Sequence, residues 1–214
     1  MGITHIYLIR HGESMGNKRD AFLGHTDLDL TPKGHMQAEQ TAHYLKNIYA
    51  DVIYSSDLMR AYSTAMHTAK IKGIDVIKNK NLREIFAGDW ENKTFEFLKE
   101  EFADEYKIWM NNIGLARCTN GESVKELQNR IVNEVIKIAK ENEGKTVFIF
   151  THATPIRALK AACDNVKMDE MRNIPWATNA SVTHAQYENS VLSIKDYSVD
   201  YFLGEIRTAL PKNV

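Results

Sequence analysis

The sequence predicts an α/β fold: a three-layer α/β/α sandwich with a mostly parallel sheet and a small helical cap inserted at about residues 86–121. Two observations support this prediction. Strand-like and helix-like segments alternate along the chain, which is typical of parallel α/β architecture. The 214 residues contain no repeat, linker or low-complexity tract, so we expect one domain over residues 1–214 with one sizeable core.

The first half of the chain contains three expected strands and two expected helices. Short apolar runs that predict strands lie at residues 3–9, 51–54 and 75–77. Thr31 followed by Pro32 is typical of a helix N-cap and first helical position, and predicts a helix to about residue 48. Asp57 is expected to cap the helix that follows the second strand. Residues 82–90 show no regular pattern, so we expect an irregular segment there.

The second half continues the alternation. Helical segments are expected at residues 95–102, 105–111 and 122–142, the last with apolar residues at helical spacing. Residues 145–150 form the most apolar run and predict a central strand, after which a helix begins near Pro155. Alternating patterns at residues 180–187 and 191–197 predict a late hairpin. We expect the tail after Phe202 to lie on the surface.

Composition excludes several classes of function. The formal net charge is −1, which gives the chain no nucleic-acid-binding or polybasic character. Cys118 and Cys163 lie far apart and form no CxxC motif, so we expect reduced thiols rather than a disulfide or a zinc site. No apolar run is long enough to span a membrane, and the first residues do not resemble a signal peptide. We therefore expect a cytoplasmic protein that binds neither nucleic acid nor membrane.

Two histidines directly follow expected strands. His11 follows the strand at residues 3–9 with Arg10 beside it, and His152 follows the strand at residues 145–150. Ligands in open α/β sheets bind beyond the carboxyl ends of the strands. Arginine binds anions through a planar fork of donors, and histidine can act as a nucleophile. Either histidine alone could equally be structural, but the pair predicts an anion site at one edge of the sheet.

Two further residues are expected at the same edge. Arg60 lies early in the helix that follows the second strand, where helix N-terminal amides also favour anions, although most arginines lie on a solvated surface. Glu84 lies among Leu, Ile, Phe and Trp residues, and desolvation could keep such a carboxyl protonated near neutral pH, as a general acid requires. We expect Trp90 to anchor this loop rather than to contact substrate, and Arg83, Asp89 and Glu91 to be surface or loop-bracing charges.

Five blocks of the sequence resemble, in order, the histidine phosphatase superfamily, which includes cofactor-dependent phosphoglycerate mutases. The blocks are Arg10-His11-Gly12-Glu13-Ser14 with Asn17, Gly24 with Leu30-Thr31-Pro32-Lys33-Gly34, Ser55-Ser56-Asp57-Leu58-Met59-Arg60, Leu82-Arg83-Glu84 with Gly88-Asp89-Trp90-Glu91, and Asn120-Gly121-Glu122-Ser123 with Thr151-His152. They extend over about residues 3–185. The resemblance implies a single histidine phosphatase domain that includes the cap.

The resemblance also implies a role for each candidate residue. His11 would attack phosphorus and become a phosphohistidine, while Glu84 would protonate the leaving alkoxide and then deprotonate the attacking water. The implied catalytic residues are His11, Glu84, Arg10, Arg60 and His152. The implied substrate-binding residues are Arg10, Asn17, Arg60, His152, Gly24, Thr151 and Ala153. No metal and no other cofactor is implied, because the two arginines and a histidine would supply the positive charge.

The phosphatase branch is favoured over the mutases. The chain has no adjacent pair of arginines, residues 95–106 are rich in acid, and residues 84–152 form a short segment for a mutase. The chain is similar to the α-ribazole phosphatase and broad-specificity bacterial branches, which implies hydrolysis of a small phosphorylated metabolite. A cofactor-dependent phosphoglycerate mutase is the first alternative.

A non-catalytic phosphate-binding regulatory module is the second alternative, and the complete set of two histidines, two arginines and an acid argues against it. A metal site at His11, His25 and His152 is disfavoured because the adjacent Arg10 repels cations. Met15, Phe22 and Trp109 could line an apolar part of the pocket, although such residues more often lie in the core. A homodimer is compatible with the sequence.

Overall fold

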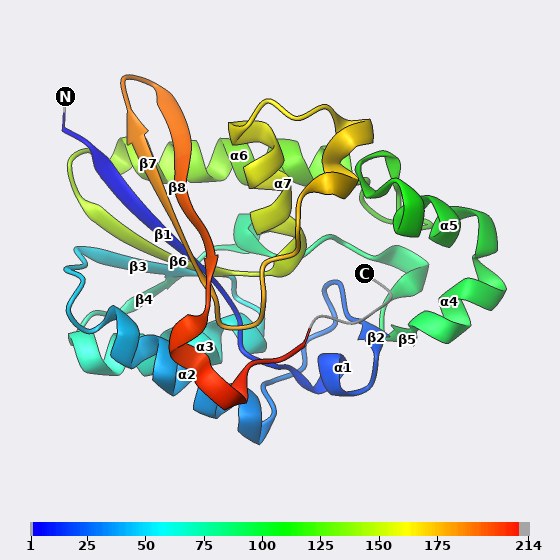
Figure 1. Ribbon diagram of the computed structural model, residues 1–214, viewed down its shortest axis with the longest axis horizontal. Coiled ribbons are helices and arrows are strands. Elements are labelled where there is room, and N and C mark those ends of the chain that lie inside the picture. Colours follow the sequence, from blue (N-terminus) through cyan, green and yellow to red (C-terminus); the bar gives the residue numbers. More distant parts are fainter. Residues whose placement is uncertain (1, 210–214) are drawn as a thin grey trace.

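A computed structural model describes residues 2–209, and a six-stranded sheet runs through its centre (Figure 1). The spatial order of the strands is β4-β3-β6-β1-β7-β8. Their bounds are β1 Thr4–Arg10, β3 Val52–Ser55, β4 Val76–Lys78, β6 Thr146–Thr151, β7 Val182–Glu188 and β8 Val191–Val199. The first four run parallel to one another, whereas β7 pairs antiparallel with both β1 and β8. This arrangement confirms the mostly parallel sheet, the central position of β6 and the late hairpin.

Helices cover both faces of the sheet (Figure 1). Those helices are α2 Pro32–Leu45 and α3 Met59–Lys72 on one face, and α6 Val124–Glu141 and α7 Ala153–Cys163 on the other. Side chains of β6 alternate between the two: Ile149 joins the apolar cluster under α6 and α7, and Phe150 joins the cluster under α2 and α3. The three-layer α/β/α prediction is therefore confirmed.

The helical cap lies at one end of the molecule, beyond the carboxyl ends of β1 and β6 (Figure 1). It consists of α4 Phe95–Glu101 and α5 Ala103–Asn111, and it is joined to the chain after β1 by a two-stranded ribbon of β2 Ala21–Phe22 and β5 Lys93–Thr94. The short helix α1 Met15–Lys18 leads into this ribbon. Leu98, Tyr106 and Trp109 bury their side chains in the same apolar cluster as α6, so the cap packs directly on the core.

One of the two predicted helix N-caps is confirmed and the other is wrong. Thr31 caps α2 as expected, because its Oγ1 accepts the amide hydrogen of Gly34 at 3.0 Å; the helix ends at Leu45, before the expected residue 48. The prediction that Asp57 caps α3 is wrong. The N-cap is Leu58, and both carboxylate oxygens of Asp57 instead accept hydrogen bonds of 2.6 Å from Arg83. A bidentate charged pair of this kind is stronger than a single cap bond.

The segment after Phe202 is only partly on the surface, contrary to expectation. Leu203 is buried, and the side-chain amide of Gln37 donates to the carbonyl of Ile206 at 2.7 Å. The expected tail also includes residues 210–214, which lie outside the described residues. No helix within residues 2–209 combines the length and apolarity that a membrane span requires.

Candidate active site

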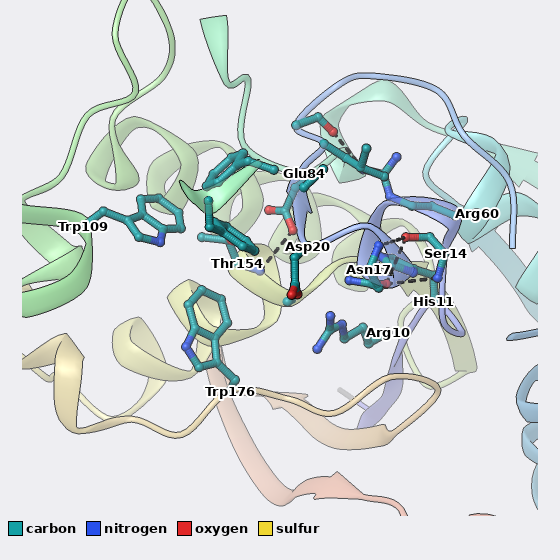
Figure 2. A pocket seen from close by; sticks show the side chains of 16 residues that line it. Arg10, His11, Ser14, Asn17, Asp20, Arg60, Glu84, Trp109, Thr154 and Trp176 are labelled. Carbon is teal, nitrogen blue, oxygen red and sulfur yellow. Dashed lines mark hydrogen bonds between the residues drawn. The ribbon is translucent and has the colours of Figure 1, made fainter. Parts of the chain in front are cut away.

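A pocket opens where β1 and β6 end beneath the cap, and it has a volume of about 110 Å³ (Figure 2). The carboxyl end of β1 and the loop after it supply Arg10, His11 and Asn17, helix α3 supplies Arg60, and the irregular segment after β4 supplies Glu84. Segments far apart in the sequence therefore meet at the edge of the sheet that the strand pattern predicts.

His11 presents one ring nitrogen to this pocket. Its Nδ1 lies 2.7 Å from the backbone carbonyl oxygen of Gly12, which can only accept a hydrogen bond, so Nδ1 carries the proton. The lone pair of the neutral ring is consequently on Nε2. The backbone of His11 is fixed on both sides, because its amide donates to Thr151 and its carbonyl accepts from the amide of Ala180 and the side chain of Asn179.

The surroundings keep His11 uncharged. Burial, followed by the positive charges of Arg60 and Arg10, lowers the pKa of His11 well below 6.5. Desolvation and nearby like charge both disfavour the imidazolium form. His11 therefore carries an available lone pair at neutral pH, which is the state that a nucleophilic histidine requires.

The two arginines are buried but only partly engaged by the protein. Arg10 Nη1 donates to the carbonyl of Ala177 at 2.6 Å, while its Nε has no protein partner among the described residues. Arg60 donates to the carbonyls of Thr26 and Gly24 at 2.9 and 2.7 Å. Burial, partly offset by Glu84, lowers the pKa of each arginine to about 10, so both remain charged at neutral pH. Their remaining N–H groups can bind an anion.

His152 lies beside His11 but behind the pocket wall. Its side chain is fully buried, its Nε2 lies 2.8 Å from Ser56 Oγ, and its Nδ1 has no hydrogen-bond partner within residues 2–209. The two imidazole rings meet edge to face, with centroids 5.2 Å apart. Burial and the charge of Arg60 lower the pKa of His152 well below 6.5, so this second histidine is also neutral.

Glu84 lies in a more polar environment than the sequence suggests. Its neighbours Leu82 and Ile85 are buried in the core, but Glu84 itself is half-buried and lines the pocket. One carboxylate oxygen accepts the amide hydrogen of Ile85 at 2.9 Å and the other that of Thr154 at 3.4 Å. The expectation of an apolar environment is therefore wrong, because consecutive residues of this extended segment point in different directions.

The remaining predicted residues divide into two groups. Asn17, Gly24 and Ala153 line the pocket, and Gly24 also fixes Arg60 through its carbonyl. Thr151 does not reach the pocket, because it is fully buried and its hydroxyl donates to the carbonyl of Leu82 at 2.7 Å. The structure thus assigns Thr151 a bracing position rather than the expected substrate contact.

The loop residues behave as expected. Trp90 is fully buried, and its indole donates to Thr119 Oγ1 at 3.1 Å. Glu91 accepts backbone hydrogen bonds from His25, Thr26 and Ala87 at 2.7 to 3.0 Å, which holds the Gly24 loop against the segment that carries Glu84.

Several pocket residues were missed by sequence reasoning. Asp20, Phe95, Thr154 and Trp176 all line the pocket, and Ser56 contacts His152 behind it. Phe22 and Trp109 also line it, as the sequence suggested, whereas Met15 does not and its side chain is exposed. Ser56 directly follows a strand, as His11 does, so the rule that placed His11 could have found it. Trp176 lies in an irregular loop before β7, and no local pattern marks it.

Comparison with known proteins places this chain in a family. The chain is 31% identical over 187 residues to phosphoserine phosphatase 1 of Hydrogenobacter thermophilus, an alignment that covers 79% of this chain and 89% of the relative. It is 29% identical over 147 residues to the adenosylcobalamin/alpha-ribazole phosphatase of Escherichia coli, which covers 69% and 72% of the two chains. Other relatives are named phosphoglycerate mutases.

Solved structures agree with the sequence relatives. Bacillus stearothermophilus YhfR superposes with a TM-score of 0.90 at 28% identity, covering 94% of this chain and 99% of the other. The family model described as the histidine phosphatase superfamily (branch 1) matches residues 6–200. The fold, the two strand-end histidines and these matches together show that this chain belongs to the histidine phosphatase superfamily and is a phosphoric monoester hydrolase.

Proposed function

We propose that this protein hydrolyses a small phosphorylated metabolite through a phosphohistidine intermediate at His11. The observation that carries the proposal is the neutral His11, whose free Nε2 shares one pocket with two buried guanidinium groups and the Glu84 carboxyl. Relatives named for phosphoserine and alpha-ribazole phosphate hydrolysis support a small phosphomonoester as the substrate.

In the first half-reaction, His11 Nε2 attacks phosphorus and the bond from phosphorus to the alcohol oxygen breaks. Glu84 transfers a proton to the departing oxygen, so a neutral alcohol leaves. Arg10 and Arg60 stabilise the charge on the three phosphoryl oxygens, while the neutral ring of His152 packs edge to face against His11 from behind the pocket. The side-chain amide of Asn17 adds a hydrogen-bond donor at the rim, since its Oδ1 is engaged by Ser14.

In the second half-reaction, water replaces the alcohol. Glu84 accepts a proton from the water, the hydroxide attacks phosphorus, and the bond from phosphorus to His11 Nε2 breaks. Inorganic phosphate leaves, and His11 returns to its neutral form. Burial and the nearby arginines stabilise that neutral form, so the same surroundings that activate the nucleophile also favour its release.

The size of the pocket supports a small substrate. A volume of about 110 Å³ is below the range typical of drug-sized ligands, so only the phosphate and a few atoms of the alcohol fit inside. We further propose that the chain is one catalytic domain in which residues 86–121 form the cap, because Phe95 and Trp109 of this segment line the pocket. The cytoplasmic location and the homodimer stay predictions.

The proposal is tested with Glu84→Gln and p-nitrophenyl phosphate. Nitrophenolate leaves without a proton, so the first half-reaction needs no acid, whereas the second still needs Glu84 as a base. We expect a burst of about one nitrophenolate per enzyme followed by slow turnover, and mass spectrometry of an alkaline quench should find the phosphoryl group on His11. Double variants that also carry His11→Ala should show no burst.

Two outcomes would contradict the proposal. Steady turnover by Glu84→Gln without a burst would remove Glu84 from the second step, and a phosphoryl group on another residue would exclude His11 as the nucleophile. Activity after EDTA treatment is expected to be intact. Conversion of 3-phosphoglycerate to 2-phosphoglycerate with a bisphosphoglycerate primer would establish the mutase alternative, while binding of phosphate esters without any turnover would establish the regulatory module.

A further inference from the structure

One acidic side chain lines the pocket without a part in the proposed phosphoryl transfer. Asp20 lies between α1 and β2, and its backbone has φ +50°, a region that Asp and Asn adopt more readily than most residues. Its amide donates to the carbonyl of Asn17 at 3.3 Å, and its own carbonyl accepts the amide hydrogen of Phe95 at 3.0 Å. The backbone of Asp20 is therefore held on one side by α1 and on the other by the cap.

The carboxylate of Asp20 has no hydrogen bond or ion pair with any described residue, although the side chain lies at the rim of a pocket with two arginines. A negative charge at this position repels a bound phosphate and weakens its binding. The charge is thus unfavourable for phosphate recognition itself, and it becomes favourable only if another part of the substrate is positive.

Aromatic rings form the neighbouring wall of the same pocket. Phe22, Phe95, Trp109 and Trp176 all line it, and the ring centroids of Phe22 and Trp109 are 4.9 Å apart. The ring centroids of Trp109 and Trp176 are 6.4 Å apart. Aromatic faces attract cations through the ring quadrupole, most strongly where water is excluded. The ring of Trp176 already has a cation on it, because the guanidinium of Arg157 lies 4.3 Å from its centroid. The other aromatic rings beside one carboxylate form a site that is better suited to an organic cation than to an anion.

Figure 2 shows how these groups are arranged along the pocket. In this view Asp20 lies between the two tryptophans, Trp109 and Trp176, on one side and Arg10 and His11 on the other. The phosphate-binding groups and the aromatic groups therefore occupy different ends of the pocket, with the carboxylate of Asp20 between them.

We propose that the alcohol part of the substrate carries an ammonium group, which binds between Asp20 and the aromatic wall. This inference rests on the proposed phosphatase function and specifies its substrate class: phosphate esters of small amino alcohols or amino acids. The positive group pairs with the exposed Asp20 carboxylate through a charge-assisted hydrogen bond and contacts the neighbouring aromatic rings.

The test compares two esters that differ in one group. 2-Aminoethyl phosphate carries an ammonium where 2-hydroxyethyl phosphate carries a hydroxyl, and the two are otherwise alike. We expect the wild-type protein to hydrolyse the amino ester with the higher kcat/KM. In Asp20→Asn this preference should fall about tenfold, mainly through KM, because a charged hydrogen bond is lost. Asn tolerates the backbone of residue 20, so the variant should fold.

The matched control is Glu96→Gln, which removes an equal charge from an exposed position in the cap that does not line the pocket. This control should retain the wild-type preference. Equal hydrolysis of the two esters by the wild type, or an unchanged preference in Asp20→Asn, would overturn the inference while leaving the phosphatase intact. Failure to hydrolyse any ester would instead refute the proposed function on which the inference rests.

Discussion

The two ends of the pocket differ in how they are built. At the phosphate end, Arg10, His11 and Arg60 are at least nine-tenths buried and are fixed by hydrogen bonds to backbone carbonyls. At the alcohol end, Phe22, Trp109 and Trp176 are equally buried, but Asp20 is exposed and Phe95 is half-buried. The positions of Asp20 and Phe95 depend on contacts between the loop after α1 and the cap.

The difference indicates that the two ends of the pocket have separate roles in catalysis and in substrate selection. The phosphate end is set by strand ends and by the start of a helix, elements whose geometry the whole sheet determines. The alcohol end is set by a ribbon of two-residue strands and by two short helices. We infer that chemistry is determined by the rigid end and substrate choice by the end whose side chains can change without disturbing the sheet.

The largest expected effect is at the phosphate end. His11→Ala should lower kcat/KM for p-nitrophenyl phosphate by about 10⁴-fold or more, because the variant has no nucleophile to form the intermediate. His35→Ala, at an exposed position outside the pocket, serves as the control and should be as active as the wild type. Substantial turnover by pure His11→Ala protein would place the chemistry elsewhere.

The next effect concerns the fixed geometry of Arg60. Arg60→Lys keeps the charge but replaces a planar fork of donors with a single nitrogen, so it does not reproduce the geometry that joins the carbonyls of Thr26 and Gly24 to a bound phosphate. We expect kcat/KM to fall about 10²-fold, because the loss of one hydrogen-bond donor that is oriented toward the transition state has an effect of about this size. Arg172→Lys at an exposed position is the control for the exchange itself. Equal activity of Arg60→Lys and wild type would mean that only the charge matters.

At the alcohol end we expect a smaller effect. Trp109→Leu removes one aromatic wall of the pocket, and KM for 2-aminoethyl phosphate should rise about fivefold, as the loss of a partly desolvated cation–π contact predicts. Phe97→Leu, on the exposed side of the cap, should leave this KM at the wild-type value. An effect of Trp109→Leu on kcat as large as that of Arg60→Lys would contradict the division between the two ends.

The smallest effect is on stability. Because the folded state keeps His11 and His152 neutral well below pH 6.5, the unfolded chain binds more protons there. Stability should therefore be complete above about pH 6.5 and decrease as the pH falls below it, by at most about 1.4 kcal/mol per pH unit for each histidine. Urea unfolding of wild type and His152→Asn checks this: the variant should lose less stability on acidification, and an equal loss would refute the neutral buried state of His152.

Much of the phosphate end could be predicted from the sequence. The carboxyl ends of parallel strands meet at one edge, so a histidine directly after each of two strands is enough to place His11 and His152 together. The same reasoning failed for Thr151, whose strand places it correctly along the chain, but whose hydroxyl is engaged by the carbonyl of Leu82. The position of a residue along a strand can be predicted from the local sequence, whereas the hydrogen-bond partner of its side chain depends on the tertiary structure.

The alcohol end could hardly be predicted at all. Asp20 and Trp176 lie in irregular segments, and their place in the pocket depends on how the cap ribbon and the loop before β7 fold over the sheet. Asp57 shows the same limit for a helix start, because its pairing with the distant Arg83 replaced the local capping bond. In each case a contact between residues far apart in the sequence overrode the local pattern.

The stereochemistry at phosphorus tests the central claim most directly. Transfer to His11 followed by transfer to water consists of two in-line displacements, each of which inverts the configuration. We therefore predict that a phosphorothioate ester whose two non-bridging oxygens are different isotopes, hydrolysed by the wild-type protein in water that carries the third isotope, yields chiral thiophosphate with overall retention of configuration. Overall inversion would show a single direct attack by water and would contradict the phosphohistidine intermediate.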